Sequence, residues 1–253
     1  PVICDTRTGQ INYKPSFYYI AHFSRHIKEH ARRIATTCYS EKMEVTAFEN
    51  PDSTIAVILL NRTTEKLPAT LRLEGELFYV PCPPCSISWT PPVFASEEGP
   101  AVAVWVSKVN ASDSGMEKGL EQQTPLQFRM DDGVNISNLI TVEENNTYQT
   151  MDGFGASITE ASAHLYQTEL SNQQQISMMT ALFDKETGIG LSMLRQPIGA
   201  TDHCVAPYTF ASSEQADSLP GFDFSHELKE IFPTVEDALA VEPGRVKVMA
   251  SCW

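Results

Sequence analysis

The sequence lacks several features that would assign it to a common class at once. No run of about 18 uncharged apolar residues occurs, which excludes a membrane-spanning helix. There is no excess of basic charge, because 18 Lys and Arg stand against 32 Asp and Glu, so a nucleic-acid partner is not expected. A GxSxG elbow and a glycine-rich phosphate loop are also absent. With neither an initiator Met nor a signal peptide, the first residue is expected to lie inside something longer.

Cysteine is scarce, with six residues in 253, which is too few for a disulfide scaffold. Cys82 and Cys85 have CxxC spacing, and a tight proline turn with two incidental thiols explains it better than a zinc or redox site. His22, His26 and His30 would line one helix face, but without an HExxH arrangement a core or solvated face is favoured over a metal site. We therefore expect neither a metal nor a cofactor.

Charge and proline divide the chain into blocks. Residues 1–92 hold 10 basic and 9 acidic residues, whereas 93–253 hold 8 and 23, and the change follows two consecutive prolines. Four N-x-[ST] sequons together favour a secretory or lysosomal route. They lie at Asn61, Asn110, Asn135 and Asn145.

The first block has the pattern of a β-sandwich. Residues 55–60 form an apolar run expected to be a buried strand, and 43–48 alternate as a half-buried strand does. Two short strands are expected at 70–73 and 77–80, with a turn at Gly75, and one or two helical turns at 24–31. Repeated short strands separated by Pro and Gly are typical of a sandwich.

Residues 93–149 continue with β patterns. Strands are expected at 101–106 and 136–142, and the polar stretch 110–124 between them is expected to be a long loop. These strands are expected to join the same sandwich.

From about residue 149 strands and helices alternate. Strands are expected at 151–156, 191–198 and 246–250, and helices at 161–170, from Ser171 onward and within 224–240. Capping-box signals stand at Ser157 and at Ser171, and the second helix has the apolar face Ile176, Met179, Leu182 and Phe183. This alternation predicts parallel pairing, but three strands are too few for a closed barrel. The predicted fold is mixed β and α/β, a β-sandwich plus an incomplete (β/α)8 (TIM-type) barrel with about three strands. The predicted domains are 1–92, 93–149 and 150–253.

Two groups of motifs resemble glycoside hydrolase family 30, the glucosylceramidase-like family. Segments 152–163, 188–195, 197–202 and 250–253 resemble the start of its barrel. Segments 17–25 and 57–63 resemble its C-terminal sandwich. The C-terminal resemblance comes first in the chain, so either a permuted chain or the junction of two tandem copies would explain the order.

The resemblance implies a retaining β-glycosidase, acting on a β-glycoside or a glucosyl lipid. Retention requires two carboxyl groups about 5–5.5 Å apart. In the family both are Glu, at the ends of strands 4 and 7, and one follows an Asn. This chain has only about three barrel strands and no Asn-Glu dipeptide. We therefore expect no catalytic residue and no activity from this chain alone.

The resemblance also implies a substrate-binding floor. Glu160 stands where the family has an Asp that hydrogen-bonds sugar hydroxyls, and the competing interpretation is a capping-box contact to the Ser157 N–H. Trp253 stands where a Trp lines the sugar pocket, and the competing interpretation is a frayed terminus.

Three more residues complete this candidate site. Phe154 could stack beside the sugar or belong to the core, and Arg195 matches the strand-2 Arg of the family. Asp202 matches a loop Asp after strand 2, although loop capping is the favoured interpretation.

Two alternatives stay open. The chain could be a non-catalytic module that binds carbohydrate or a partner protein, or a fragment or misjoined product of tandem genes. An unfilled barrel would expose strand edges, so a second chain or a further segment is expected to complete it. The sequons favour a secreted or lysosomal location.

Overall fold

A computed structural model describes residues 2–90, 92–96, 99–110, 115–131, 133, 136, 138–211 and 221–252. The chain divides into two compact units: Tyr13–Gly153, and Val2–Asn12 together with the chain from Phe154 onward. The hairpin of β1 (Val2–Asp5) and β2 (Gln10–Tyr13) thus lies almost wholly in the second unit, although it precedes the sandwich strands in sequence. The predicted boundary of 1–92 does not separate this hairpin from the sandwich.

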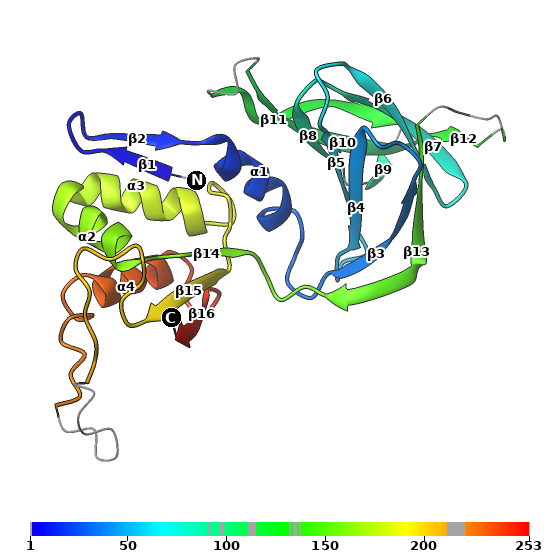
Figure 1. Ribbon diagram of the computed structural model, residues 1–253. Helices are drawn as coiled ribbons and strands as arrows, with labels where there is room; N and C mark the ends of the chain where they lie inside the picture. The colour runs from blue at the N-terminus through cyan, green and yellow to red at the C-terminus, as the bar shows by residue number, and fades with distance from the viewer. Residues whose placement is uncertain are drawn as a thin grey trace. The chain divides into compact units, whose positions relative to one another are not determined.

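The first unit is one strongly curved sheet around a single apolar core, with eleven strands among the described residues (Figure 1). Its order is β11-β10-β8-β5-β4-β3-β13-β6-β7-β12, and β9 pairs with β10. The strands are β3 (Arg32–Cys38), β4 (Met43–Glu49), β5 (Ile55–Asn61), β6 (Leu67–Leu73), β7 (Glu76–Cys82), β8 (Ser86–Thr90), β9 (Pro92–Ser96), β10 (Gly99–Val109), β11 (Met116–Gln127), β12 (Arg129–Met130) and β13 (Leu139–Thr150).

Strand β5 shows why the apolar run forms the centre of this sheet. It pairs with β4 on one side and β8 on the other, and nearly all of its residues are buried. A continuous run of β-branched and aliphatic side chains suits a strand covered on both faces. The strand predictions at 43–48, 55–60, 70–73 and 77–80 are confirmed, and Glu74 and Gly75 turn the last two with φ of 50° and 79°.

The polar stretch 110–124 is not the loop that its composition suggests. Much of it belongs to β11, which pairs antiparallel with β10. Strand β11 stands at the end of the sheet order, so among the described strands it pairs with β10 on one side only. Its residues are exposed or half-buried. A polar edge strand resembles a loop in composition because it lacks a buried face, and polar edges also discourage unwanted strand pairing.

Strand β13 joins the two sequence blocks. It lies between two strands of the first block, antiparallel to β3 and parallel to β6. Its residues Ile140 and Val142 are 0% and 5% exposed and belong to the common core. Strands from both blocks therefore build one sheet.

The helix of this unit lies earlier than predicted. Helix α1 spans Pro15–Ser24, so the helical turns expected at 24–31 are wrong. Pro15 stands in the first turn, where its missing N–H costs nothing, and Arg25 closes the helix through its N–H to the Ala21 carbonyl. His30, with φ of 67°, lies in a turn that a helix cannot include.

Of the histidines at helical spacing, His22 is buried and His26 is half-buried, which favours the core interpretation. His22 is 0% exposed, and its Nε2 lies 2.8 Å from the Ser107 hydroxyl. The His26 ring lies against Trp105, with centroids 5.2 Å apart. Burial lowers the pKa of both imidazoles to about 3, and for His26 the charges of His22 and Arg25 add to this effect.

The second unit contains three parallel strands in the order β14-β15-β16 with helices between them (Figure 1). Its elements are β14 (Gly155–Ser157), α2 (Glu160–Glu169), α3 (Asn172–Phe183), β15 (Met193–Ile198), α4 (Ile231–Val241) and β16 (Lys247–Cys252). Ser157 pairs with Arg195, which pairs with Met249. The predicted fold class, a sandwich plus an incomplete barrel, is confirmed.

Two glycines allow β14 to form where it does. Gly153 has φ of 146°, a conformation that residues with side chains rarely adopt. A Cβ on Gly155 would lie 2.0 Å from the Met193 carbonyl oxygen, so only glycine permits this closeness of β14 and β15. The Gly-Phe-Gly sequence therefore fixes the start of the parallel sheet.

Helix α3 begins as predicted but does not bury its whole predicted face. The Gln174 side chain accepts the Ser171 N–H at 2.9 Å, which completes a capping box. Met179 and Phe183 are buried, whereas Ile176 is 61% exposed and lines a groove of about 540 Å³ between α3 and α4. In the described part of the chain, no helix combines the length and the apolarity needed to cross a membrane.

We predict that acid destabilises the first unit through His22 and His26. Their folded pKa values lie below the unfolded value of 6.5, so stability is complete above pH 6.5 and falls as pH decreases toward 3. At pH 4.5 the loss is on the order of 2–3 kcal/mol for each imidazole. Urea unfolding at pH 7 and 4.5 measures it, with Trp105 fluorescence as a local probe.

The double variant His22→Gln/His26→Gln should have a flatter pH dependence than the parent chain. Equal slopes for variant and parent between pH 6.5 and 4.5 would contradict this account. A substitution of the exposed His30 by Gln serves as the control and should leave the slope unchanged.

Candidate functional site

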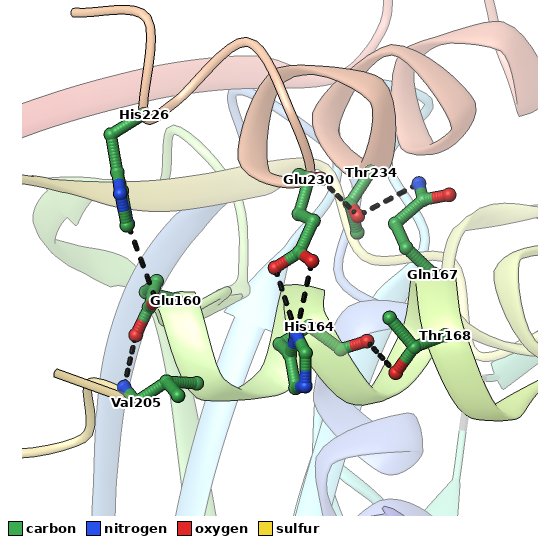
Figure 2. Close-up of polar contacts among 8 residues, drawn as sticks. All are labelled: Glu160, His164, Gln167, Thr168, Val205, His226, Glu230 and Thr234. Atoms are coloured by element: carbon green, nitrogen blue, oxygen red, sulfur yellow. Dashed lines mark hydrogen bonds and ion pairs between the residues drawn. The ribbon is translucent and has the colours of Figure 1, made fainter.

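The candidate site lies where the three parallel strands of the second unit end. In such sheets the loops at the carboxyl ends of the strands carry the functional side chains. Here Glu160 follows β14, and residues 199–211 follow β15. The chain then returns through 221–230 to α4, and Figure 2 shows contacts between that segment and α2.

Glu160 is the buried centre of this region. It is the first residue of α2 and is only 7% exposed. Its Oε2 accepts a short hydrogen bond from the Val205 N–H, and its Oε1 lies 3.2 Å from His226 Nε2 (Figure 2). The capping-box interpretation is wrong, because the helix begins after Thr159 and the Glu160 carboxylate contacts the neighbouring loops instead of Ser157.

The loop after β15 is fastened to the start of α2 at two points. The Ala161 N–H donates to the His203 carbonyl at 3.1 Å, and the Val205 N–H donates to Glu160. The first N–H groups of a helix lack partners within the helix, so the loop carbonyl acts as a cap. The backbone of residues 203–205 is therefore held at the edge of the sheet.

His226 connects this carboxylate to an aromatic group. Its ring stacks on Tyr208, with centroids 3.9 Å apart and planes at 27°. Burial raises the pKa of Tyr208, and the negative charges of Glu227 and Glu160 raise it further. Tyr208 is therefore a neutral hydroxyl at any physiological pH.

A second imidazole–carboxylate pair lies one helical turn along α2. His164 Nδ1 lies 2.9 and 3.0 Å from the two oxygens of Glu230, which precedes α4 (Figure 2). Further along, the Gln167 side chain donates to the Thr234 hydroxyl at 3.1 Å. Hydrogen bonding to Glu230 raises the pKa of His164, and the charges of Glu160 and Glu169 act in the same direction.

Two other predicted residues lie on or next to this sheet. Arg195 is half-buried on β15, and its Nε donates to the Ser251 hydroxyl on β16 at 2.9 Å. Its carbonyl accepts the Ser157 hydroxyl at 3.0 Å. Phe154 is half-buried and precedes β14. Its carbonyl accepts a hydrogen bond from the Ser192 N–H at 2.9 Å.

The last two predicted residues are Asp202, whose side chain is exposed, and Trp253. The Asp202 side chain is 68% exposed and lies 4.0 Å from His203 Nε2. The turn is capped by Thr201, whose hydroxyl accepts the His203 N–H at 3.0 Å, so the loop-capping interpretation of Asp202 is wrong. Trp253 lies outside the described residues.

The sequons differ in accessibility. Asn61 is 1% exposed, and its amide donates to the carbonyls of Glu65, Cys82 and Pro83 at 2.8, 3.3 and 2.7 Å. A glycan on this nitrogen is incompatible with these contacts. Asn145 is exposed and Asn110 is half-buried, and both remain predicted sites. Asn135 lies outside the described residues.

Within the described ranges, no group of three or more His, Cys, Asp or Glu residues is arranged to hold a metal ion. Cys82 is buried, and burial raises the pKa of its thiol to about 12, which suppresses the reactive thiolate. The Cys85 thiol lies 3.4 Å from the Thr63 carbonyl.

Sequence reasoning missed His226, Tyr208 and the His164–Glu230 pair. A usable signal was present, because α2 carries Glu160-x3-His164 and the later segment carries His226-x3-Glu230. A Glu-then-His pair and a His-then-Glu pair at the same spacing allow two facing segments to form two carboxylate–imidazole contacts. Only the structure shows that they do.

The chain matches two domain models of one family. The model described as the glycosyl hydrolase family 30 beta sandwich domain matches residues 30–88. The model described as the glycosyl hydrolase family 30 TIM-barrel domain matches residues 151–253. Both segments belong to glycoside hydrolase family 30. The predicted resemblance is confirmed, including the order in which the family 30 sandwich segment precedes the barrel segment.

Relatives of this family 30 chain include a curated enzyme and solved structures. It is 35% identical to the lysosomal acid glucosylceramidase of Mus musculus over 72 residues, 28% of this chain and 14% of that protein. The endo-beta1,6-glucanase BT3312 is 28% identical with a TM-score of 0.43, covering 55% of this chain and 28% of that chain. SrfJ from Salmonella typhimurium is 24% identical with a TM-score of 0.45, covering 53% and 29%. The matched part spans less than a third of each relative.

We predict that Glu160→Ala loosens the loop after β15. The Val205 N–H loses its charged acceptor, and a hydrogen bond to a charged group contributes about 1.5–3 kcal/mol. Exchange of the Val205 amide with deuterium, followed by NMR, should accelerate by about tenfold or more. Asp202→Ala, which alters an exposed side chain of the same loop, should leave that rate unchanged. Unaltered protection in Glu160→Ala would show that the carboxylate does not hold the loop.

We predict that the His164–Glu230 pair stabilises the α2–α4 contact mainly at acidic pH. The folded pKa of His164 is raised above 6.5, so the stabilisation is complete below pH 6.5 and is lost as pH rises through the folded value. Titration of the His164 ring protons by NMR measures it. Glu230→Gln should bring the pKa down toward its ordinary range, whereas Glu236→Gln on the same helix should not. A pKa that is equal in Glu230→Gln and the parent chain would refute the pairing.

Proposed function

We propose that this chain is the sugar-binding part of a retaining β-glycosidase that acts on a β-glycoside such as a glucosyl lipid. The observation that carries the proposal is the matching of both domain types of family 30, joined to polar groups at the carboxyl ends of its barrel strands. The similarity to a glucosylceramidase supports a glucosyl lipid as the substrate.

In this proposal Glu160 accepts hydrogen bonds from sugar hydroxyls. A carboxylate has about four acceptor positions, and His226 and the Val205 N–H use two of them. The proposal assigns the remaining positions to sugar hydroxyl groups. Glu160 is one methylene longer than an Asp, and the bonds to its neighbours fix the extra length.

Four other residues share the floor of the proposed site. Arg195 provides a permanent positive charge, and Phe154 provides an apolar face for the C–H side of a sugar. Trp253 would pack on the sugar in the same way. Asp202, in the loop after β15, would accept a hydrogen bond from a sugar hydroxyl. The half-buried position of Arg195 on β15 supports its role, because that strand ends at the same edge as Glu160.

We propose further that these 253 residues do not hydrolyse a glycoside by themselves. Retaining hydrolysis needs an acid/base and a nucleophile about 5–5.5 Å apart. The family resemblance puts both on later barrel strands, one of them after an Asn, and no Asn-Glu dipeptide occurs in this sequence. The acetal would therefore be bound without being cleaved.

Further barrel strands, from a second chain or from a continuation of this one, would complete the site. Strand β16 pairs only with β15 among the described strands. Val248 and Met249 on β16 are 44% and 51% exposed, which supports a missing neighbour. The sequons and the lysosomal relative support a secreted or lysosomal location.

We predict that the chain binds methyl β-glucoside, detectable by NMR, and does not release the fluorophore of a β-glucoside substrate. Arg195→Gln should weaken binding by roughly tenfold, which corresponds to one hydrogen bond from a charged group. Arg7→Gln, at an arginine whose side chain is 88% exposed, is the matched control and should not alter it.

Two outcomes would count against the proposal. Turnover that Glu160→Ala abolishes would show that the chain is an enzyme on its own. Absence of any shift with methyl β-glucoside would remove the sugar-binding role.

A further inference from the structure

The connection from β15 to α4, together with the first turn of α4, carries a run of exposed and half-buried aromatic side chains, here named the aromatic strip. Its members are Tyr208, Phe210, Phe222, Phe224 and Phe232. Successive ring centroids lie 6.0, 5.8, 6.1 and 6.4 Å apart. Phe222, Phe224 and Phe232 are 51%, 47% and 38% exposed. Contiguous exposed apolar groups of this kind mark an interaction surface.

The orientation of the rings indicates which ligand fits. Neighbouring planes in the aromatic strip are inclined to each other by 69°, 47°, 53° and 40°. Because these neighbouring rings are not parallel, the strip as a whole offers no single flat platform, although one ring alone can stack on a sugar or a base. A flexible alkyl chain, which needs only apolar contact, can follow such a surface.

The aromatic strip is continuous with the polar end of the site. His226 stacks on Tyr208, the first ring of the strip, and its Nε2 lies 3.2 Å from Glu160. Moving from Glu160 through His226 to Phe232, the lining changes from a carboxylate to an imidazole and then to hydrocarbon. The sequence of lining groups therefore matches a ligand with a polar head and an apolar tail.

One charged group, Asp223, lies within this surface, because its carboxylate is exposed and hydrogen bonds from Ser225 lower its pKa. Asp223 lies between two of the phenylalanines in sequence, and its carboxylate accepts the Ser225 N–H and the Ser225 hydroxyl at 2.8 Å each. The Leu228 side chain, 55% exposed in the same segment, adds further apolar area.

We propose that the aromatic strip binds the alkyl tail of an amphiphilic β-glycoside whose sugar head lies at Glu160, with His226 at the junction. The location of the head rests on the proposed function. The tail-binding surface rests on the rings alone, so the two can be tested separately.

Calorimetry with methyl, hexyl and octyl β-glucoside, each below its micelle concentration, tests the proposal on the full chain. Affinity should rise with chain length, by up to about fourfold for each methylene that is fully buried, and by at least tenfold from methyl to octyl. The variant Phe222→Ser/Phe224→Ser should lose at least tenfold in octyl β-glucoside affinity and none for methyl β-glucoside. Both rings are exposed, so the change leaves the core intact. Tyr39→Ser, at a tyrosine 93% exposed in the first unit, is the control.

The outcomes separate the head from the tail. Methyl β-glucoside binding with no gain from longer chains overturns the aromatic strip proposal and leaves the proposed function standing. Octyl binding that disappears in the Phe222→Ser/Phe224→Ser variant, without any methyl β-glucoside binding, supports the strip and counts against the sugar site. A chain-length effect that persists in the variant overturns the strip proposal. So does binding to phosphatidylcholine vesicles without any gain from monomeric octyl β-glucoside, because the surface would then serve a bilayer.

Discussion

The buried carboxylate of Glu160 organises the candidate site. An ionised carboxylate with little solvent contact needs hydrogen-bond donors, and here a backbone N–H of the loop after β15 and the imidazole of His226 provide them. Because those donors come from two different segments, one side chain fixes both at the edge of the sheet. The aromatic strip adjoins the same contact, since the His226 ring stacks on Tyr208.

Patterns with a clear period could be predicted from the sequence, and so could motifs with a strict spacing. The apolar run of β5, the capping box at Ser171 and the three parallel strands all follow from side-chain periodicity or local hydrogen bonding. Strand β11 could not be predicted, because at a sheet edge tertiary pairing alone turns a polar stretch into a strand. Helix α1 was misplaced because it begins at Pro15, and a proline can either begin a helix or break one.

The candidate site was predictable only in part. Family motifs led to Glu160 and Arg195, and the structure places Glu160 just after β14 and Arg195 on the adjacent strand β15, opposite Ser157. They did not lead to His226, because its importance arises from a contact across 66 positions of sequence. The one side chain that contacts the Glu160 carboxylate among the described residues could therefore not be found from local sequence patterns.

The position of β13 between β3 and β6 explains how the two sequence blocks can share a fold. A sheet does not record which loop connects its strands, so blocks that are reversed relative to the family can still fill neighbouring places in it. The boundary in charge near residue 92 is therefore a boundary of sequence and not of the sheet.

The buried amide of Asn61 has a consequence for how the chain is made. In a compartment that attaches glycans to nascent chains, closure of the β5–β7 region and the glycosylating enzyme would compete for one nitrogen. If the β5–β7 region folds first, the Asn61 amide is buried and protected. If the glycan is attached first, three carbonyls lose their hydrogen-bond donor and the strands cannot pack around Asn61. The molecules that reach the native fold would then be those in which this region folded before Asn61 could be glycosylated.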